Sequence, residues 1–174
     1  MNGSGSGFSG GIRLLLLSAW LGAAIFFSAI VAPAAFSTLR SFQVTNVNEI
    51  AGAIVNRALA VVNVSGFLIS LAVLALTLSA ERKNMKMPVV ASSIALLLMA
   101  TATAVGHWVI AARMRGLRLA MVTIDLVPPD DPRRVAFNNL HRYSVISLML
   151  AMLAAIAAIV LTGFRPRSGA RKTS

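Results

Sequence analysis

The chain has 174 residues, of which 57% are hydrophobic and only 12% are charged, and it contains no cysteine. On a water-soluble domain of this size such a balance would leave large apolar patches exposed, so we expect lipid to cover the surface. The net charge of +11 comes from basic residues that flank apolar runs, which favours anionic lipid headgroups over nucleic acid as the partner. Disulfides and thiolate metal sites are excluded.

Four apolar runs, none with an internal Lys, Arg, Asp or Glu, dominate the chain. A hydrocarbon core of about 30 Å needs roughly 20 helical residues, and each run meets that length. The sequence therefore predicts an all-α integral membrane protein, an antiparallel four-helix bundle in one domain from residue 12 to 164. The expected spans are residues 14–36, 58–80, 88–112 and 143–164.

The two ends of the chain read as disordered tails. Residues 1–11 are rich in Gly and Ser, and residues 165–174 are basic and polar, so neither segment can bury much apolar surface. Four spans place both tails on one side of the membrane. Lys and Arg are evenly divided between the two sides, but they are densest in the tails and the short loop at 81–86. We therefore expect a protein of the inner (plasma) membrane with both termini in the cytoplasm.

Capping signals precede the second and fourth spans. Asn46 and Glu49 have N-cap and N3 spacing, which predicts a helix from about Val47. Asp131 followed by Pro132 predicts that the fourth helix begins there. Helices 2 and 4 should therefore extend beyond the bilayer on one side.

The third connection contains the only proline pair. Pro128-Pro129 must interrupt whatever precedes it, because two residues without a backbone donor also force extended backbone before them. Residues 117–127, which follow Gly116, are expected to form a short interfacial helix.

Small and polar side chains recur on one face of each run, as helix association in lipid requires. Among these, Asn63 is the deepest amide, and we expect it either to donate an interhelical hydrogen bond or to contact a ligand. The members are Ser18, Ala19, Gly22 and Ala23 in the first run, Asn56, Asn63, Gly66, Ser70 and Thr77 in the second, Ser93, Ala100, Thr103 and His107 in the third, and Ser144, Ser147, Ala151, Ala154 and Ala158 in the fourth.

Both histidines, His107 and His141, fall at the same predicted membrane edge, close to Asn56, Arg57 and Ser144. One hypothesis is a site for a small polar ligand or for a metal ion, copper or zinc, since neutral imidazole binds both ions. Another is a single b-type haem between the two imidazoles. Each residue also has a structural alternative: an interhelical hydrogen bond for His107, an interfacial role for His141, and an Arg57 side chain that reaches the headgroups.

Catalytic signatures are missing from the sequence. There is no His-Glu-x-x-His, no Gly-x-Ser-x-Gly, no acidic pair inside a span and no phosphate-cradling loop. We therefore predict that the protein is not an enzyme. An accessory subunit of a larger membrane complex fits the small size and the flexible tails, so membrane lipid and other subunits are the expected partners.

Several motifs resemble a known family. They are Trp20-Leu21-Gly22, Phe26-Phe27, Val31-Ala32-Pro33-x-x-Phe36 and Phe137-x-x-Leu140-His141-Arg142-x-Ser144. This pattern is similar to a bacterial membrane family of unknown function related to transmembrane protein 205, and more loosely to copper-resistance D-like four-helix proteins. The resemblance implies a four-span bundle with relatives linked to metal or drug tolerance.

The resemblance also singles out residues. Gly22 would allow close approach of the first helix, Pro33 would end or kink it, and Phe36 would fill the resulting gap. His107 lies outside the family pattern, which leaves His141 as the stronger candidate ligand. The function expected from sequence is thus a non-enzymatic accessory subunit or a metal- or stress-tolerance protein, with metal or haem binding as the alternative.

Overall fold

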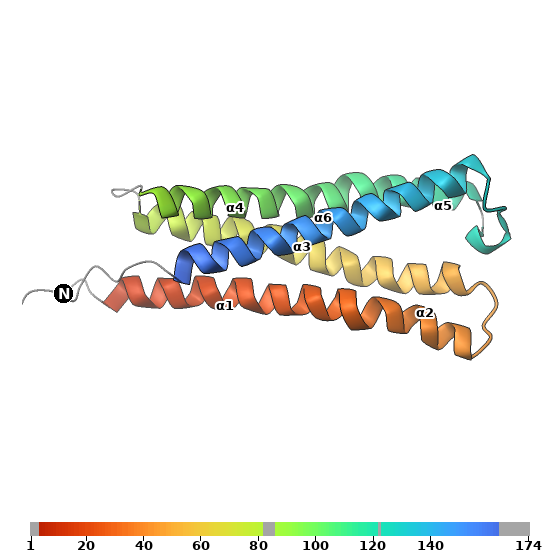
Figure 1. The fold of residues 1–174 in the computed structure, drawn as a ribbon, viewed down its shortest axis with the longest axis horizontal. Helices are drawn as coiled ribbons and strands as arrows, with labels where there is room; N and C mark the ends of the chain where they lie inside the picture. The colour runs from red at the N-terminus through yellow and green to blue at the C-terminus, as the bar shows by residue number, and fades with distance from the viewer. Residues whose placement is uncertain (1–3, 82–85, 122, 164–174) are drawn as a thin grey trace, which may run out of the picture.

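A computed structural model describes residues 4–81, 86–121 and 123–163, and within these ranges it contains helices but no strand. Four rods, Gly10–Ser41, Val47–Glu81, Met87–Met121 and Pro132–Gly163, are long and apolar enough to cross a membrane. Successive rods run in opposite directions along an elongated molecule (Figure 1). The elements are α1 (Ser4–Phe26), η1 (Phe27–Val31), α2 (Ala32–Ser41), α3 (Val47–Glu81), α4 (Met87–Ala104), η2 (Val105–Ile110), α5 (Ala111–Met121), η3 (Ile124–Leu126) and α6 (Pro132–Gly163).

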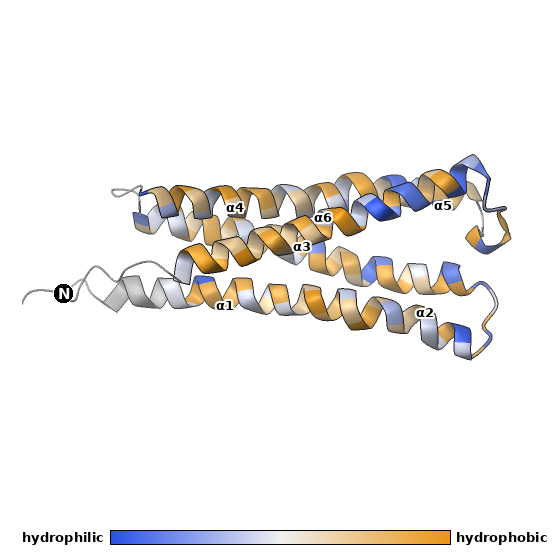
Figure 2. Ribbon diagram, viewed as in Figure 1, coloured by the Kyte–Doolittle hydropathy of each residue, from blue (hydrophilic) through white to orange (hydrophobic). Residues whose placement is uncertain are grey.

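The outer surface of each rod is apolar. Leu15, Val61, Ile94 and Leu153, one from each rod, are all more than half exposed. Apolar residues cover the lengths of the rods, whereas polar ones gather where α2 and α3 meet α5 and α6 (Figure 2). So continuous an apolar surface is unfavourable in water and is covered by lipid in a membrane. The chain is a multi-pass membrane protein.

A tryptophan and a glycine fit together where α1 packs on α3. The Trp20 indole N–H donates to the Val62 carbonyl at 2.9 Å and is buried. A Cβ at Gly66 would lie only 2.7 Å from the indole ring, so α3 needs glycine there. The prediction for Gly22 was wrong, because a Cβ there meets nothing within 4 Å. The large indole occupies the interface instead, and the four small residues predicted there, Ser18, Ala19, Gly22 and Ala23, are exposed.

The polar stripes of the other three rods face inward. Asn63, Ser70 and Thr77 of α3 are buried, as are Thr103 and Ser144. The hydroxyls of Ser70 and Thr77 donate to carbonyls of their own helix. These two residues therefore contribute to the interface through the small size of their side chains. A different serine makes an interhelical bond: Ser147 of α6 donates to the Ala102 carbonyl of α4 at 2.8 Å.

Two π-helical turns allow long rods to bend without ending. Around η1, the Ala32 N–H donates to the Phe27 carbonyl, one residue further back than in an α-helix. This register accommodates Pro33, so the rod continues past the predicted end at residue 36 to Ser41. Around η2, Ala111 bonds the Gly106 carbonyl in the same way.

The short interfacial helix expected over residues 117–127 does not begin after Gly116. The helix runs through it to Met121, and only the short η3 follows, because a single glycine costs a helix about 1 kcal/mol and does not end it. The N-terminal segment also differs from expectation: α1 begins at Ser4, within the supposed tail, since extending an existing helix adds one hydrogen bond per residue. The predicted tail at 165–174 and loop residues 82–85 lie outside the described ranges.

The helix starts predicted at Val47 and Pro132 are confirmed. Asp131 caps α6, accepting the backbone N–H of Arg133 at 2.8 Å and also bonding its guanidinium. Hydrogen bonds from that side chain first, and then from the backbone, lower the pKa of the Asp131 carboxyl from its usual 3.8 to about 2. At α3 the capping differs from prediction, because Asn46 adopts a φ of 59° and a distant carboxylate performs the role.

Candidate functional site

A cavity of about 440 Å³ lies at the end of the molecule where α2 and α3 meet α5 and α6. We call it the arginine chamber. At this end α2 packs on α3 and α5 packs on α6, and the chamber occupies the space between the two pairs. Its lining is Phe36, Arg40, Asn48, Gly52, Val55, Asn56, Leu59, Ala111, Met114, Arg115, Arg118, Ile124, Arg134, Phe137, Asn138, His141 and Ser144.

The short η3 ties the two sides of the chamber together. Asp125 accepts the Asn48 amide at 2.6 Å and the backbone N–H of Glu49 at 3.1 Å, which caps α3 from a segment 76 residues away. A carboxylate is favoured at this place by the positive end of the helix dipole. Glu49 in turn forms an ion pair with Arg118 at 3.5 Å. These contacts hold α3 against α5 although the bundle is open between them.

Four arginines line the chamber, and two of them have structural partners. Arg118 pairs with Glu49 and lies 5.6 Å from the centre of the Phe137 ring. Arg134 donates to the Val127 carbonyl. Arg40 and Arg115 are exposed side chains for which the described residues provide no hydrogen bond or ion pair. The chamber therefore presents at least two uncommitted guanidinium groups.

No carboxylate is among the described residues that line the chamber. The carboxylates of Glu49 and Asp125 instead connect the elements around the chamber, through bonds to α3, α5 and η3. The lining thus combines four guanidinium groups with three side-chain amides, one imidazole and one hydroxyl. Such a set offers many donors and a positive potential, which suits an anion and opposes a divalent cation.

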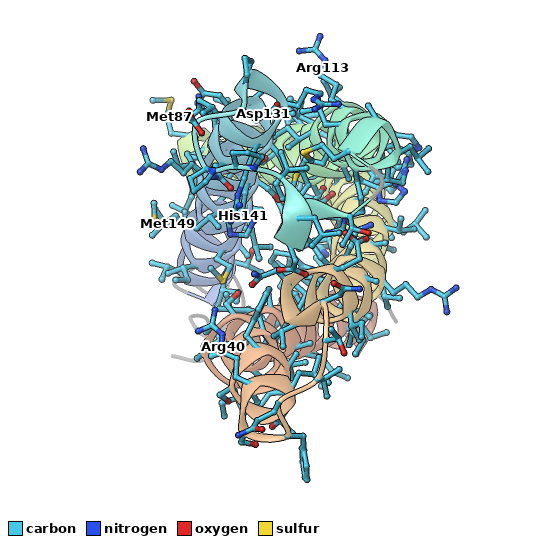
Figure 3. The ribbon with its side chains drawn as sticks, turned by 90° about the vertical axis from the view of Figure 1, so that its right-hand side faces the viewer. Arg40, Met87, Arg113, Asp131, His141 and Met149 are labelled. Atoms are coloured by element: carbon cyan, nitrogen blue, oxygen red, sulfur yellow. The ribbon has the colours of Figure 1, made fainter. Side chains whose placement is uncertain are left out.

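The open side of the chamber is marked by Arg40 and His141. Viewed from this end, the two side chains lie on the same side of the molecule, one from α2 and the other from α6 (Figure 3). Both residues are exposed. Arg113 of α5 points away from the chamber in the same view and does not line it.

Five of the residues singled out from sequence meet in the chamber: Asn56, His141, Ser144, Phe36 and Phe137. Four of these five come from α3 and α6, whose helical periodicity aligns them. On α6, positions 134, 137, 138, 141 and 144 fall on one face. The phenylalanine expected to fill a gap beside Pro33 is thus a wall of this cavity.

The other candidates lie elsewhere. His107 sits on η2 outside the chamber, and its ring packs edge-on against Trp108 at 4.9 Å. Its Nδ1 is buried and has no hydrogen-bond partner among the described residues. The chamber therefore contains one of the two histidines, and no group of three or more His, Cys, Asp or Glu residues suited to a metal occurs in the described ranges.

Asn63 and Arg57 also lie outside the chamber. The Asn63 amide packs against η2, so that a Cβ at Gly106 would be 3.3 Å from its nitrogen. Arg57 is exposed on α3, one residue after Asn56, as expected of a side chain that reaches headgroups. Trp20, Gly22 and Pro33 belong to the rod of α1 and α2 and likewise do not line the cavity.

The four arginines of the chamber, together with Asn48 and Asn138, were not predicted from sequence as site residues. A signal for them exists in the composition. The chain has eight basic residues on the α2, α3, α5 and α6 segments that surround this end, and all eight are arginine. The three lysines, Lys83, Lys86 and Lys172, belong to the segments that follow α3 and α6.

Comparison with protein families gives one match. Residues 15–123, well over half of the chain, match the family described as a domain of unknown function, DUF4149. This range covers most of α1 and all of η1, α2, α3, α4, η2 and α5, and it ends before α6. The match shows no link to transmembrane protein 205 or to copper-resistance D proteins. No curated protein and no solved structure matches the chain.

Proposed function

The chain belongs to the DUF4149 family, and from that premise we propose that it is a membrane protein that binds an anionic ligand in the arginine chamber. The observation that carries the proposal is the charge of the lining, with four guanidinium groups and no carboxylate among its described residues. Two of the four, on Arg40 and Arg115, have no partner within the described ranges. Guanidinium groups that line one cavity repel one another, and an anion bound between them relieves that repulsion.

Metal binding is the weaker alternative. His141 would have to bind a cation next to arginines, against their repulsion. A haem held between both histidines would need His107 in the same cavity, and it is not part of the lining. Copper, zinc and haem therefore stay predictions from sequence, as do the roles in a larger complex and in metal or stress tolerance.

We also propose that the protein binds its ligand without transforming it. The chamber offers one imidazole and one hydroxyl, on His141 and Ser144, but no described carboxylate to orient the imidazole as a base. Arginines and amides position an anion and do not supply a nucleophile.

The proposed topology is an antiparallel bundle in the inner membrane with both termini in the cytoplasm. The chamber then opens at the outer face, where α3 and α6 project beyond the bilayer. Because the chain has no cysteine, single cysteines test this directly. An Asp130→Cys variant in the α5–α6 connection should react with a membrane-impermeant maleimide added to intact spheroplasts, whereas Met87→Cys should react only after lysis. The reverse pattern would contradict the topology.

Anion binding is tested with inorganic phosphate and the full chain, purified in a neutral maltoside detergent. We expect phosphate to raise the melting temperature above that in chloride of equal ionic strength. The double variant Arg40→Gln, Arg115→Gln should bind phosphate at least about 100-fold more weakly, because each charged hydrogen bond contributes about 1.5–3 kcal/mol. The control is Arg113→Gln, which removes a charge from the same helix outside the chamber. Equal binding by all three proteins, or none by the wild type, would refute the proposal.

A further inference from the structure

The lining of the arginine chamber changes from charged to apolar along the helix axes. On α3 the order runs from Asn48 near the η3 end to Leu59 towards the middle of the bundle. On α5 it runs from Arg118 and Arg115 to Met114 and Ala111, whereas on α6 the residues nearer the middle, His141 and Ser144, are polar. A ligand that matches both ends must carry its charge near the connections and its apolar part towards the bilayer.

The arginine chamber is also longer and larger than a small ion requires. The eleven helical steps from Asn48 to Leu59 span about 16 Å. A cavity of about 440 Å³ has room for roughly 15 waters at about 30 Å³ each. An inorganic anion held by Arg40 and Arg115 would leave most of that space, including the apolar part near Val55 and Leu59, to water.

The open side lies at the predicted membrane edge, where lipid headgroups are expected. Arg40 and His141 mark it, and beside them Phe36 lies on α2 one turn nearer the bilayer centre. The helix pairs that pack extensively at this end are α2 with α3 and α5 with α6, and α2 with α6 is not among them, whereas the η3 contacts close the end of the molecule. A molecule could therefore enter sideways from the membrane.

The use of arginine and not lysine around the chamber indicates which charged group the ligand carries. All eight basic residues around this end are arginine, although the chain uses lysine in other segments. Guanidinium groups bind phosphate oxygens in pairs with a fixed geometry, which the point charge of lysine cannot do. From the gradient, the size, the open side and the arginines, we propose that the occupant is a phosphate-bearing membrane amphiphile, with its phosphate on Arg40 and Arg115 and an acyl chain along Val55 and Leu59.

This proposal rests on the proposed function, because it names the class of the same ligand. The test is native mass spectrometry of the full chain in neutral detergent, with inorganic phosphate and with phosphatidic acids whose two chains have four, six or eight carbons. We expect one bound lipid per chain and an affinity that rises about fourfold for each methylene the chamber buries. Dioctanoylglycerol, which has the chains without the phosphate, should bind at least about 100-fold more weakly than its phosphatidic acid.

Two variants test the apolar part and the phosphate of the ligand separately. Leu59→Gln should reduce the gain with chain length and leave the binding of inorganic phosphate unchanged, whereas Arg40→Gln with Arg115→Gln should weaken both ligands. Arg113→Gln should weaken neither. The chain-length series on the wild type needs no variant to fold.

The outcomes are distinguishable. If phosphate binds through the two arginines but added methylenes give no gain, the amphiphile is wrong and the anion site stands. If phosphatidic acid binds equally well to the double arginine variant, it occupies a general lipid layer and the amphiphile is wrong. If the same variant also binds inorganic phosphate as well as the wild type does, both proposals are wrong. Dioctanoylglycerol binding as tightly as its phosphatidic acid would also overturn the assignment of a phosphate headgroup.

Discussion

Replacing Gly66 by alanine should open the contact between α1 and α3. The new methyl would lie 2.7 Å from Trp20 Cε2 and Nε1, whereas carbon atoms in normal contact are about 3.5–4.0 Å apart. The indole must therefore move by roughly 1 Å, and its 2.9 Å hydrogen bond to Val62 lengthens with it. The ring cannot move freely, because it is only 3% exposed and packs in the main core cluster.

The size of the effect follows from three contributions, two that destabilise and one that opposes them. Overpacking a core by one methyl costs about 1–3 kcal/mol. An interhelical hydrogen bond inside a membrane contributes about 0.6 kcal/mol on average. Alanine favours helix over glycine by up to about 1 kcal/mol, which opposes the loss. We therefore expect Gly66→Ala to lower the free energy of unfolding by about 2 kcal/mol.

The assay is unfolding by SDS in mixed micelles, followed by Trp20 fluorescence in a Trp108→Phe background, since the chain has two tryptophans. Gly22→Ala is the matched control, because its methyl would enter open space on the same α1 rod that carries Trp20. It should leave stability unchanged or slightly higher. If Gly66→Ala were as stable as Gly22→Ala, the packing of Trp20 on α3 would be wrong.

Three further predictions concern the frame of the bundle. Asp125→Ala should speed hydrogen exchange at the start of α3 and cost about 1 kcal/mol, as loss of a helix cap does, whereas Asp130→Ala should change neither. Because Arg133 lowers the pKa of Asp131 below its unfolded value, the capping stability is complete above about pH 4 and is lost as the pH falls towards 2. Thermal melts between pH 5 and pH 2 should show this loss, and Asp131→Asn should abolish it. Ser147→Ala removes one interhelical donor and should lower the free energy of unfolding by about 0.6 kcal/mol.

The rods and their inward faces could be predicted because lipid imposes simple rules on sequence. Runs without charge fix the spans, and the seven-residue spacing of Asn63, Ser70 and Thr77 fixes the inner face of α3. The inner face of α1 was predicted wrongly, because small residues there suggested an interface that the larger Trp20 occupies. One glycine on the opposite helix, Gly66, decides that contact, and local sequence cannot show which partner it meets.

Only some of the residues that line the chamber could be predicted from sequence. Helical spacing on α6 brought His141, Ser144 and Phe137 together, and these were found. Arg40 and Arg115 were counted for topology as charges at a membrane edge, and nothing local distinguishes such a residue from one lining a cavity. The Asp125 cap on α3 joins positions 76 residues apart, so it follows from the packing of the rods and could not be derived beforehand.

What co-purifies with the protein tests the central claim most directly. The full chain should be extracted from native membranes in gentle detergent, and its bound lipid, phosphorus and metal measured against protein. We predict about one tightly held phosphate-bearing lipid per chain, absent from the Arg40→Gln, Arg115→Gln variant and retained by Arg113→Gln. A bound metal or haem with no such lipid, or a lipid that both variants retain equally, would contradict the account.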